Sequence, residues 1–220
     1  MKRLFLCLAL IVSGSLVFAQ NKISEGTITY DVEWQLPEQM QPYAAMFPKE
    51  VKVFFQGDSA SWKNENQMSA TTTITNVKAE FTRLLLDIPM MGKKFAVTFT
   101  PADVEKMADK MPEFVLTEGT ETKTIAGYNA KKYSAEEKKS GSKSEAWFTK
   151  EVEIPQNSFN QFFDAKYGFP VEFNTFANGL GLKAKVKEVK AGAVPAGVFS
   201  TGKDYETMSL EQLMQMQGGQ

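Results

Sequence analysis

Residues 25–36 read EGTITYDVEWQL, and apolar and polar side chains alternate along the whole stretch. Ile28, Tyr30, Val32, Trp34 and Leu36 fall on one side, and threonine, acidic and glutamine side chains fall on the other. A period of two over this length predicts a β-strand with one apolar face and one solvated face. The apolar face needs a cover, which is either the rest of the protein or a ligand that the protein binds.

The same alternation recurs at 49–57 (KEVKVFFQG), 93–100 (KKFAVTFT) and 180–189 (LGLKAKVKEV). Other segments share the threonine, valine and aromatic content of strands, and turn residues separate them. The chain is therefore expected to form about ten short strands, mostly antiparallel because parallel strands need long crossover connections.

Three stretches have helical character: 37–47, which contains Pro42, then 101–111, and 209–216 near the C-terminus. Pro101 suits the first turn of a helix, and Ser209 and Gln212 have the spacing of a capping box. In the second stretch the apolar side chains recur at helical spacing, namely at Val104, Met107, Ala108 and Met111.

These elements predict an α+β domain in which a strongly curved antiparallel sheet, an incomplete β-barrel, carries helices 37–47 and 101–111 on its concave side. A closed up-and-down barrel is the alternative. We expect one domain over residues 20–208, followed by a C-terminal helix and tail over 209–220.

The first 19 residues have the features of a cleavable signal peptide. Lys2 and Arg3 precede the apolar run 4–12, and Val17-Phe18-Ala19 places small residues where signal peptidase cleaves, so cleavage is expected after Ala19. The apolar run is too short to span a bilayer, and no later run of about 18 apolar residues follows. The mature chain is thus expected in the periplasm, or secreted, without a transmembrane span.

Composition narrows the possible chemistry. The chain has no histidine, and its single cysteine, Cys7, lies within the expected signal peptide. The mature chain therefore lacks the residues for the common zinc, copper and iron sites and for a Ser–His or Cys–His nucleophile pair. Loss of Lys2 and Arg3 with the signal peptide takes Lys+Arg from 25 to 23 against 26 acidic residues, a formal charge of −3, which does not suit nucleic-acid binding.

The acidic pair Glu136-Glu137 is the first candidate for acid–base catalysis, but its neighbours are polar and it adjoins a Ser/Gly turn. A catalytic carboxyl group would need burial to bring its pKa near neutrality. We interpret the pair as a solvated hairpin tip, and we expect neither an enzyme nor a cofactor or metal site.

The order of several segments resembles a family of exported bacterial envelope proteins whose function is unknown. The matching segments are GTITY (26–30), TKTIAGYNAKKY (122–133), AWFTKEV (146–152), GFPVEFN (168–174) and VPAGVFSTGKDYETMSLEQL (194–213). In architecture this family is similar to the lipoprotein carriers LolA and LolB. The resemblance implies a half-barrel closed by short helices, which in the carriers holds acyl chains.

The expected function is accordingly non-catalytic binding or transport of an apolar ligand, such as a lipid or a lipoprotein acyl chain. The 11 methionines favour adaptable apolar packing, although methionine also fills ordinary cores. The alternative is a module with a fully packed core that binds another envelope protein. The residues expected to line the cavity are Ile28, Tyr30, Val32, Trp34, Val53, Phe55, Phe95, Val97, Phe99, Val104, Met107 and Met111.

Overall fold

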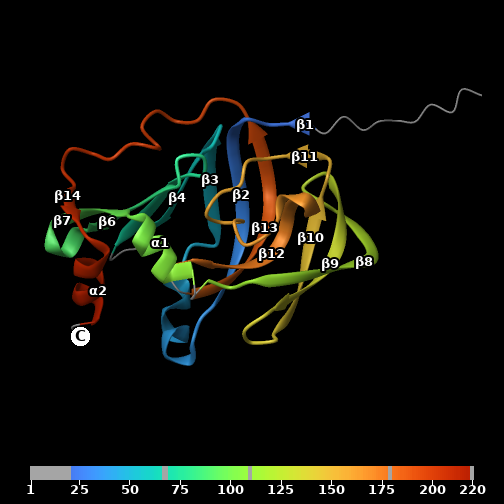
Figure 1. Ribbon diagram of the computed structural model, residues 1–220, viewed down its shortest axis with the longest axis horizontal. Helices are drawn as coiled ribbons and strands as arrows, with labels where there is room; N and C mark the ends of the chain where they lie inside the picture. The colour runs from blue at the N-terminus through green and yellow to red at the C-terminus, as the bar shows by residue number, and fades with distance from the viewer. Residues whose placement is uncertain (1–20, 66–68, 109–110, 178–179, 219–220) are drawn as a thin grey trace, which may run out of the picture.

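The computed structural model describes residues 21–65, 69–108, 111–177 and 180–218. The expected signal peptide and its cleavage site lie outside these residues, as do residues 219 and 220 of the expected tail. Within them the chain is mostly β-structure with short helices (Figure 1). The strands are β1 Asn21–Lys22, β2 Glu25–Gln35, β3 Glu50–Gln56, β4 Ser59–Glu65, β5 Ala70–Asn76, β6 Phe81–Ile88, β7 Lys93–Phe99, β8 Phe114–Ile125, β9 Tyr128–Glu137, β10 Lys143–Thr149, β11 Val152–Glu153, β12 Phe169–Ala177, β13 Leu180–Ala191 and β14 Glu206–Met208.

Twelve of the described strands form one sheet in the order β14-β7-β6-β5-β4-β3-β2-β13-β12-β10-β9-β8. All neighbours are antiparallel except β14, which pairs in parallel with β7. A separate parallel pair joins β1 to β11. The sheet is therefore mixed but largely antiparallel, as the alternating segments predict.

The helices are short. The 3₁₀ helix η1 spans Glu38–Met46, and two further 3₁₀ turns, η2 and η3, span Pro89–Met91 and Ala165–Tyr167. The α-helices are α1, Pro101–Ala108, and α2, Leu210–Gly218. The expected capping box is present, because Gln212 N donates to Ser209 Oγ at 3.1 Å and Ser209 N donates to Gln212 Oε1 at 2.9 Å.

The sheet is open and not strongly curled, so the expectation of an incomplete barrel is wrong, as is the alternative of a closed barrel. Its ends, β8 and β14, do not pair with each other. In β6 and β7, apolar side chains are buried on both faces of the sheet, which a barrel wall with one wet face does not show. Leu86 packs with α2 on one face, and Leu85 packs on the other face near Phe199 and Tyr205.

Cross-strand register places the apolar side chains of β2, β3 and β7 on one face of the sheet. Ile28 pairs with Val53, and Val53 with Trp62. From Trp62 the register continues through Thr73 and Leu84 to Val97. Directly opposed residues point to the same side, so the expected shared face exists.

The cover of the β2–β3 part of this face differs from the expectation. Helix α1 contacts β7, and η1 buries no side chain. The face is covered instead by residues 154–168, which connect β11 to β12 and which we call the connecting segment. Its Phe159 is fully buried, with its ring centroid 5.0 Å from that of Tyr30 and 5.4 Å from that of Trp62. Aromatic rings from this segment fill the space that we expected helices to cover.

Candidate ligand-binding pocket

A pocket of about 420 Å³ lies between the start of β8, a sheet edge strand, and the second half of the connecting segment. Exposed polar side chains form its rim, and half-buried or buried aromatic and aliphatic side chains form its walls. Its size is within the range of small-molecule sites. The lining residues are Met111, Pro112, Glu113, Phe114, Leu116, Gln161, Phe162, Phe163, Asp164, Lys166 and Tyr167.

Hydrogen bonds within the connecting segment fix the wall of this pocket. Phe159 N donates to Asn157 Oδ1, and Asn157 N donates to Asn160 Oδ1, both at 2.9 Å. Asp164 caps η3 by accepting from Lys166 N at 2.9 Å. Asparagine and aspartate favour such local turns because their side chains accept from nearby backbone amides.

Gly168 ends the segment with φ of 99°, a conformation that side chains with a Cβ rarely adopt. A Cβ added to this glycine would also lie 2.3 Å from the carbonyl oxygen of Thr149. Both constraints require glycine where the segment returns to the sheet at β12.

The charged groups of the rim are paired with one another or with a neighbour. Glu113 forms an ion pair with Lys138, and Asp164 Oδ2 lies 2.9 Å from Lys166 Nζ. The backbone amide and side chain of Lys166 lower the pKa of Asp164, and Asp164 raises the pKa of Lys166. Each of these rim charges therefore has a partner of opposite sign.

Phe163 joins the pocket to the core. Its ring stacks on Phe114 with centroids 5.4 Å apart and meets Phe173 edge-on at 5.5 Å. Phe173 in turn lies 5.9 Å from Tyr30. Phe163 also borders a second pocket of about 60 Å³, which is lined by residues of β11, the connecting segment and the start of β12.

The structure distributes the expected cavity residues over several places. Ile28, Tyr30, Val32, Val53 and Phe55 are buried in the core cluster that also contains Phe159, and Trp34 packs at its margin. Phe95 and Val97 pack in a separate cluster with Leu213 of α2. Phe99 and Met107 are half-buried, Val104 is 44% exposed, and Met111 alone of this set borders the 420 Å³ pocket.

The sequence reasoning missed the aromatic residues of the connecting segment. Residues 157–168 read NSFNQFFDAKYG, in which four aromatic side chains stand among turn-forming residues without strand or helix periodicity. Such a concentration of aromatic residues in a segment with turn chemistry is the signal that could have indicated a buried connection.

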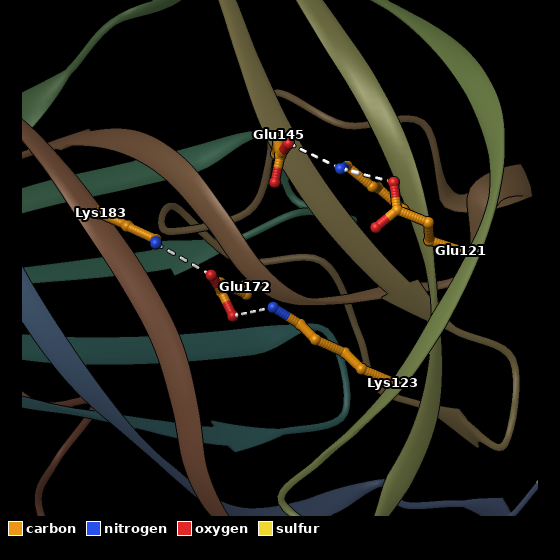
Figure 2. A network of polar contacts seen from close by, with 6 residues as sticks. Glu121, Lys123, Glu145, Glu172 and Lys183 are labelled. Atoms are coloured by element: carbon orange, nitrogen blue, oxygen red, sulfur yellow. Dashed lines mark hydrogen bonds and ion pairs between the residues drawn. The ribbon is translucent and has the colours of Figure 1, made fainter.

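The opposite face of the sheet in the β8–β13 half carries ion pairs instead (Figure 2). The Glu172 carboxylate forms ion pairs with Lys123 Nζ at 2.7 Å and with Lys183 Nζ at 2.9 Å. Burial alone would raise the pKa of Glu172, but the hydrogen bonds from both lysines lower it overall. Lys132 bridges Glu121 and Glu145 at 2.9 and 2.7 Å. Glu172 is only 7% exposed, so this network is partly buried, and its two lysines supply the counter-charge that a buried carboxylate requires.

Glu137, one of the two candidate catalytic acids, is bound within a turn. It accepts hydrogen bonds from the backbone amides of Lys139 and Ser140. Hydrogen bonds from Ser140 and Lys139 lower the pKa of Glu137 to about 2. Glu137 is buried, at 9% exposed, so the expectation of a solvated hairpin tip fits Glu136 and not Glu137, whose carboxylate the turn keeps in its charged form.

Among the described residues, no group of three or more histidine, cysteine or acidic side chains is placed to hold a metal ion. In the same part of the chain, no helix has the length and hydrophobicity needed to cross a bilayer.

Comparison with known proteins identifies similarity at the level of fold. No protein-family model matches the chain, and no curated protein matches it. Among solved structures, "Structure of PNGF-II in C2 space group" matches with a TM-score of 0.50 and 14% sequence identity. The match covers 88% of this chain and 32% of the other, so the chain spans about a third of that protein's length. At this identity the likeness concerns the fold alone.

Proposed function

We propose that the chain is an exported, non-catalytic protein that binds an apolar ligand, such as a lipid or an acyl chain. The observation that carries the proposal is the 420 Å³ pocket between β8 and the connecting segment, with aromatic and aliphatic walls. Its wall residues Phe114, Leu116 and Phe162 remain half-buried although the adjoining core is packed. Apolar surface held in a concave site is stabilised when a ligand removes it from water.

The paired rim charges support an uncharged ligand body over an anionic one. A ligand carboxylate near Asp164 would compete with that residue for Lys166, which Asp164 already contacts at 2.9 Å. An ester, an alcohol or an alkyl chain would leave this pair intact. The proposed ligand class is therefore a neutral lipid or a similar apolar molecule.

A matched pair of substitutions on β8 tests the proposal. Leu116 lines the pocket, whereas its neighbour Val115 is 48% exposed and does not. Leu116→Trp adds a large side chain to the pocket wall, and Val115→Trp adds the same side chain next to it. Titration with the neutral dye Nile red should be saturable, with affinity about tenfold weaker in Leu116→Trp, about 1.4 kcal/mol, and unchanged in Val115→Trp.

Purification of the mature chain from its own envelope, followed by solvent extraction and mass spectrometry, would identify a native ligand. Absence of an extracted lipid together with a non-saturable dye response would contradict the proposal. An equal loss of dye binding in both variants would show that the pocket is not the site.

A second candidate is an interaction module that binds another envelope protein. The observation that favours it is a set of exposed methionines: Met90 is 82% exposed and Met91 60% exposed in η2, and Met214 on α2 is 56% exposed. The rest of the apolar stripe on α2 packs on the protein's own sheet, with Leu213 buried. Replacing Met90 and Met91 by serine should abolish partner capture under this candidate and leave Nile red binding unchanged.

A further inference from the structure

The connecting segment is attached to the sheet chiefly by its aromatic side chains. Among the hydrogen bonds of the described residues, one joins it to the sheet, from Thr175 Oγ1 to the carbonyl oxygen of Phe159 at 2.9 Å. Its other hydrogen bonds stay within it, as with Gln156 Nε2 to the carbonyl oxygen of Phe163 at 2.7 Å. A segment bonded internally in this way can move as a unit without breaking the sheet ladder.

Polar atoms beneath the segment have no hydrogen-bond partner among the described residues. These atoms include the Tyr30 hydroxyl and Trp62 Nε1, whose rings flank Phe159 on β2 and β4. Tyr30 is completely buried and Trp62 is 5% exposed. A buried donor without an acceptor bears the full cost of desolvation, so two such donors beside one ring are a feature that needs an explanation.

A continuous series of rings connects these donors to the open pocket. It begins at Phe114 and Phe163 in the pocket wall and continues through Phe173 to Tyr30, with successive centroids 5.4, 5.5 and 5.9 Å apart. Phe159 then lies between Tyr30 and Trp62. Displacement of Phe163 and Phe159 would extend the pocket inward as far as the two unpaired donors.

The chemistry of the inner end distinguishes between ligand types. The buried polar residues of the described chain include no lysine or arginine. A carboxylate at this depth would therefore lack a counter-charge, whereas a hydroxyl or carbonyl oxygen needs only hydrogen bonds. Tyr30 Oη–H and Trp62 Nε1–H are both donors, and each can serve such an oxygen.

We propose that Phe159 and Phe163 are displaceable and that the space they fill is the inner half of the ligand site. There the Tyr30 hydroxyl and the Trp62 indole N–H donate to an uncharged oxygen at the end of an apolar ligand, such as a fatty alcohol or a fatty ester. This inference rests on the proposed function, because the ligand enters through the same pocket.

The test uses the mature chain labelled with 5-fluorotryptophan, observed by ¹⁹F NMR. Its three tryptophans are Trp34, Trp62 and Trp147, and Trp62→Phe assigns the signal of interest. Trp147 lies on the opposite face, with Lys123 Nζ 4.0 Å from its ring centroid, and serves as an internal reference. Titration with 1-dodecanol should shift the Trp62 signal saturably and leave that of Trp147 in place.

Substitutions then separate the inner site from the outer pocket. Tyr30→Phe should weaken dodecanol binding about fivefold, the equivalent of one hydrogen bond, and leave binding of dodecane unchanged. Tyr133→Phe makes the same change at another buried tyrosine and should have no effect. Phe159→Ala, or Phe159→Leu if the alanine variant does not fold, should tighten binding about a hundredfold by removing the ring that must be displaced.

The titrations distinguish between failure of the inner site, of the uncharged ligand class and of the proposed function. If dodecanol binds and Leu116→Trp weakens it, but the Trp62 signal and the Tyr30→Phe affinity do not change, the inner site is refuted while the outer pocket stands. If dodecanoate binds as tightly as dodecanol and shifts the Trp62 signal, the uncharged class is refuted. If neither compound nor Nile red binds, the proposed function fails and the inner site fails with it.

Discussion

Replacement of Phe159 by alanine tests whether the connecting segment is part of the core. The Phe159 side chain is fully buried and contacts the rings of Tyr30, Trp62 and Phe173. Burial of a phenylalanine is worth about 1.5–3 kcal/mol, and the cavity left by truncation adds to this. We therefore expect Phe159→Ala to lower the free energy of unfolding by about 3–5 kcal/mol.

Urea denaturation followed by circular dichroism measures this change, with the slope of the transition used to check that the unfolded state is unaltered. Phe162→Ala is the matched control, because Phe162 belongs to the same segment but is only half-buried. It should cost about 1 kcal/mol, since less of its surface leaves water. A loss below about 1 kcal/mol for Phe159→Ala would refute the reasoning, because a ring that covers the sheet cannot be removed so cheaply.

Three further predictions concern other parts of the molecule. Tyr30→Phe removes a buried hydroxyl without a partner, so unfolding free energy should stay the same or rise by up to about 1 kcal/mol; a loss above about 2 kcal/mol would show that the hydroxyl is bonded. The pKa of Glu137 is lowered to about 2, so the stability that its carboxylate gives the fold is complete above pH 4.5, the ordinary pKa, and is lost as pH falls toward 2. Glu137→Gln should therefore make the free energy of unfolding less dependent on pH between 4.5 and 2, and an unchanged pH profile would contradict this. Leu213→Ala should lower the free energy of unfolding by about 2–4 kcal/mol, measured by heat or urea, because Leu213 packs α2 on the sheet. Met214→Ala should lower it by less than about 0.5 kcal/mol because Met214 is exposed, and equal effects of the two substitutions would show that α2 does not pack on the sheet.

The local sequence pattern was sufficient to predict strands that keep the same face buried along their length, and the start of the C-terminal helix. The alternation in 25–36 predicts β2, and those in 49–57, 93–100 and 180–189 predict β3, β7 and β13. The Ser209–Gln212 spacing predicts the start of α2. In each case the period, or the cap, depends on residues close in sequence, so a single stretch contains the necessary information.

The curvature of the sheet depends on what lies on both of its faces, which the alternation of single strands does not encode. Leu84, Leu85 and Leu86 form a continuous apolar run in β6, and such a run indicates burial on both sides. A half-barrel with one solvated face does not accommodate such a run. Within η1, Pro42 has no backbone amide to donate and its ring clashes with the preceding turn of an α-helix, so the sequence itself marks this helix as interrupted.

Part of the cavity assignment could be derived from the sequence, because the expected strand residues share one face. The alternation of side chains does not encode the order of the strands in the sheet. Phe95 and Ile28 belong to the same face, yet β3, β4, β5 and β6 lie between their strands, and different segments cover the two places. The pocket itself arises where the start of β8 meets residues 161–167, about 45 positions later in the chain, and no local signal links the two.

The order of strands has a consequence for how the molecule folds. β2 to β7 follow one another in space as they do in sequence, and so do β8, β9 and β10, which makes both groups local antiparallel meanders. The two groups are united where β2 pairs with β13, so that Ala184 lies opposite Val32, a separation of about 150 residues. Closing so long a loop is slow, whereas the meanders can form early. We expect an intermediate with two partly ordered halves and the central β2–β13 pairing still open, so that amide exchange during refolding would protect β3–β7 before β13 and the β2 amides that face it.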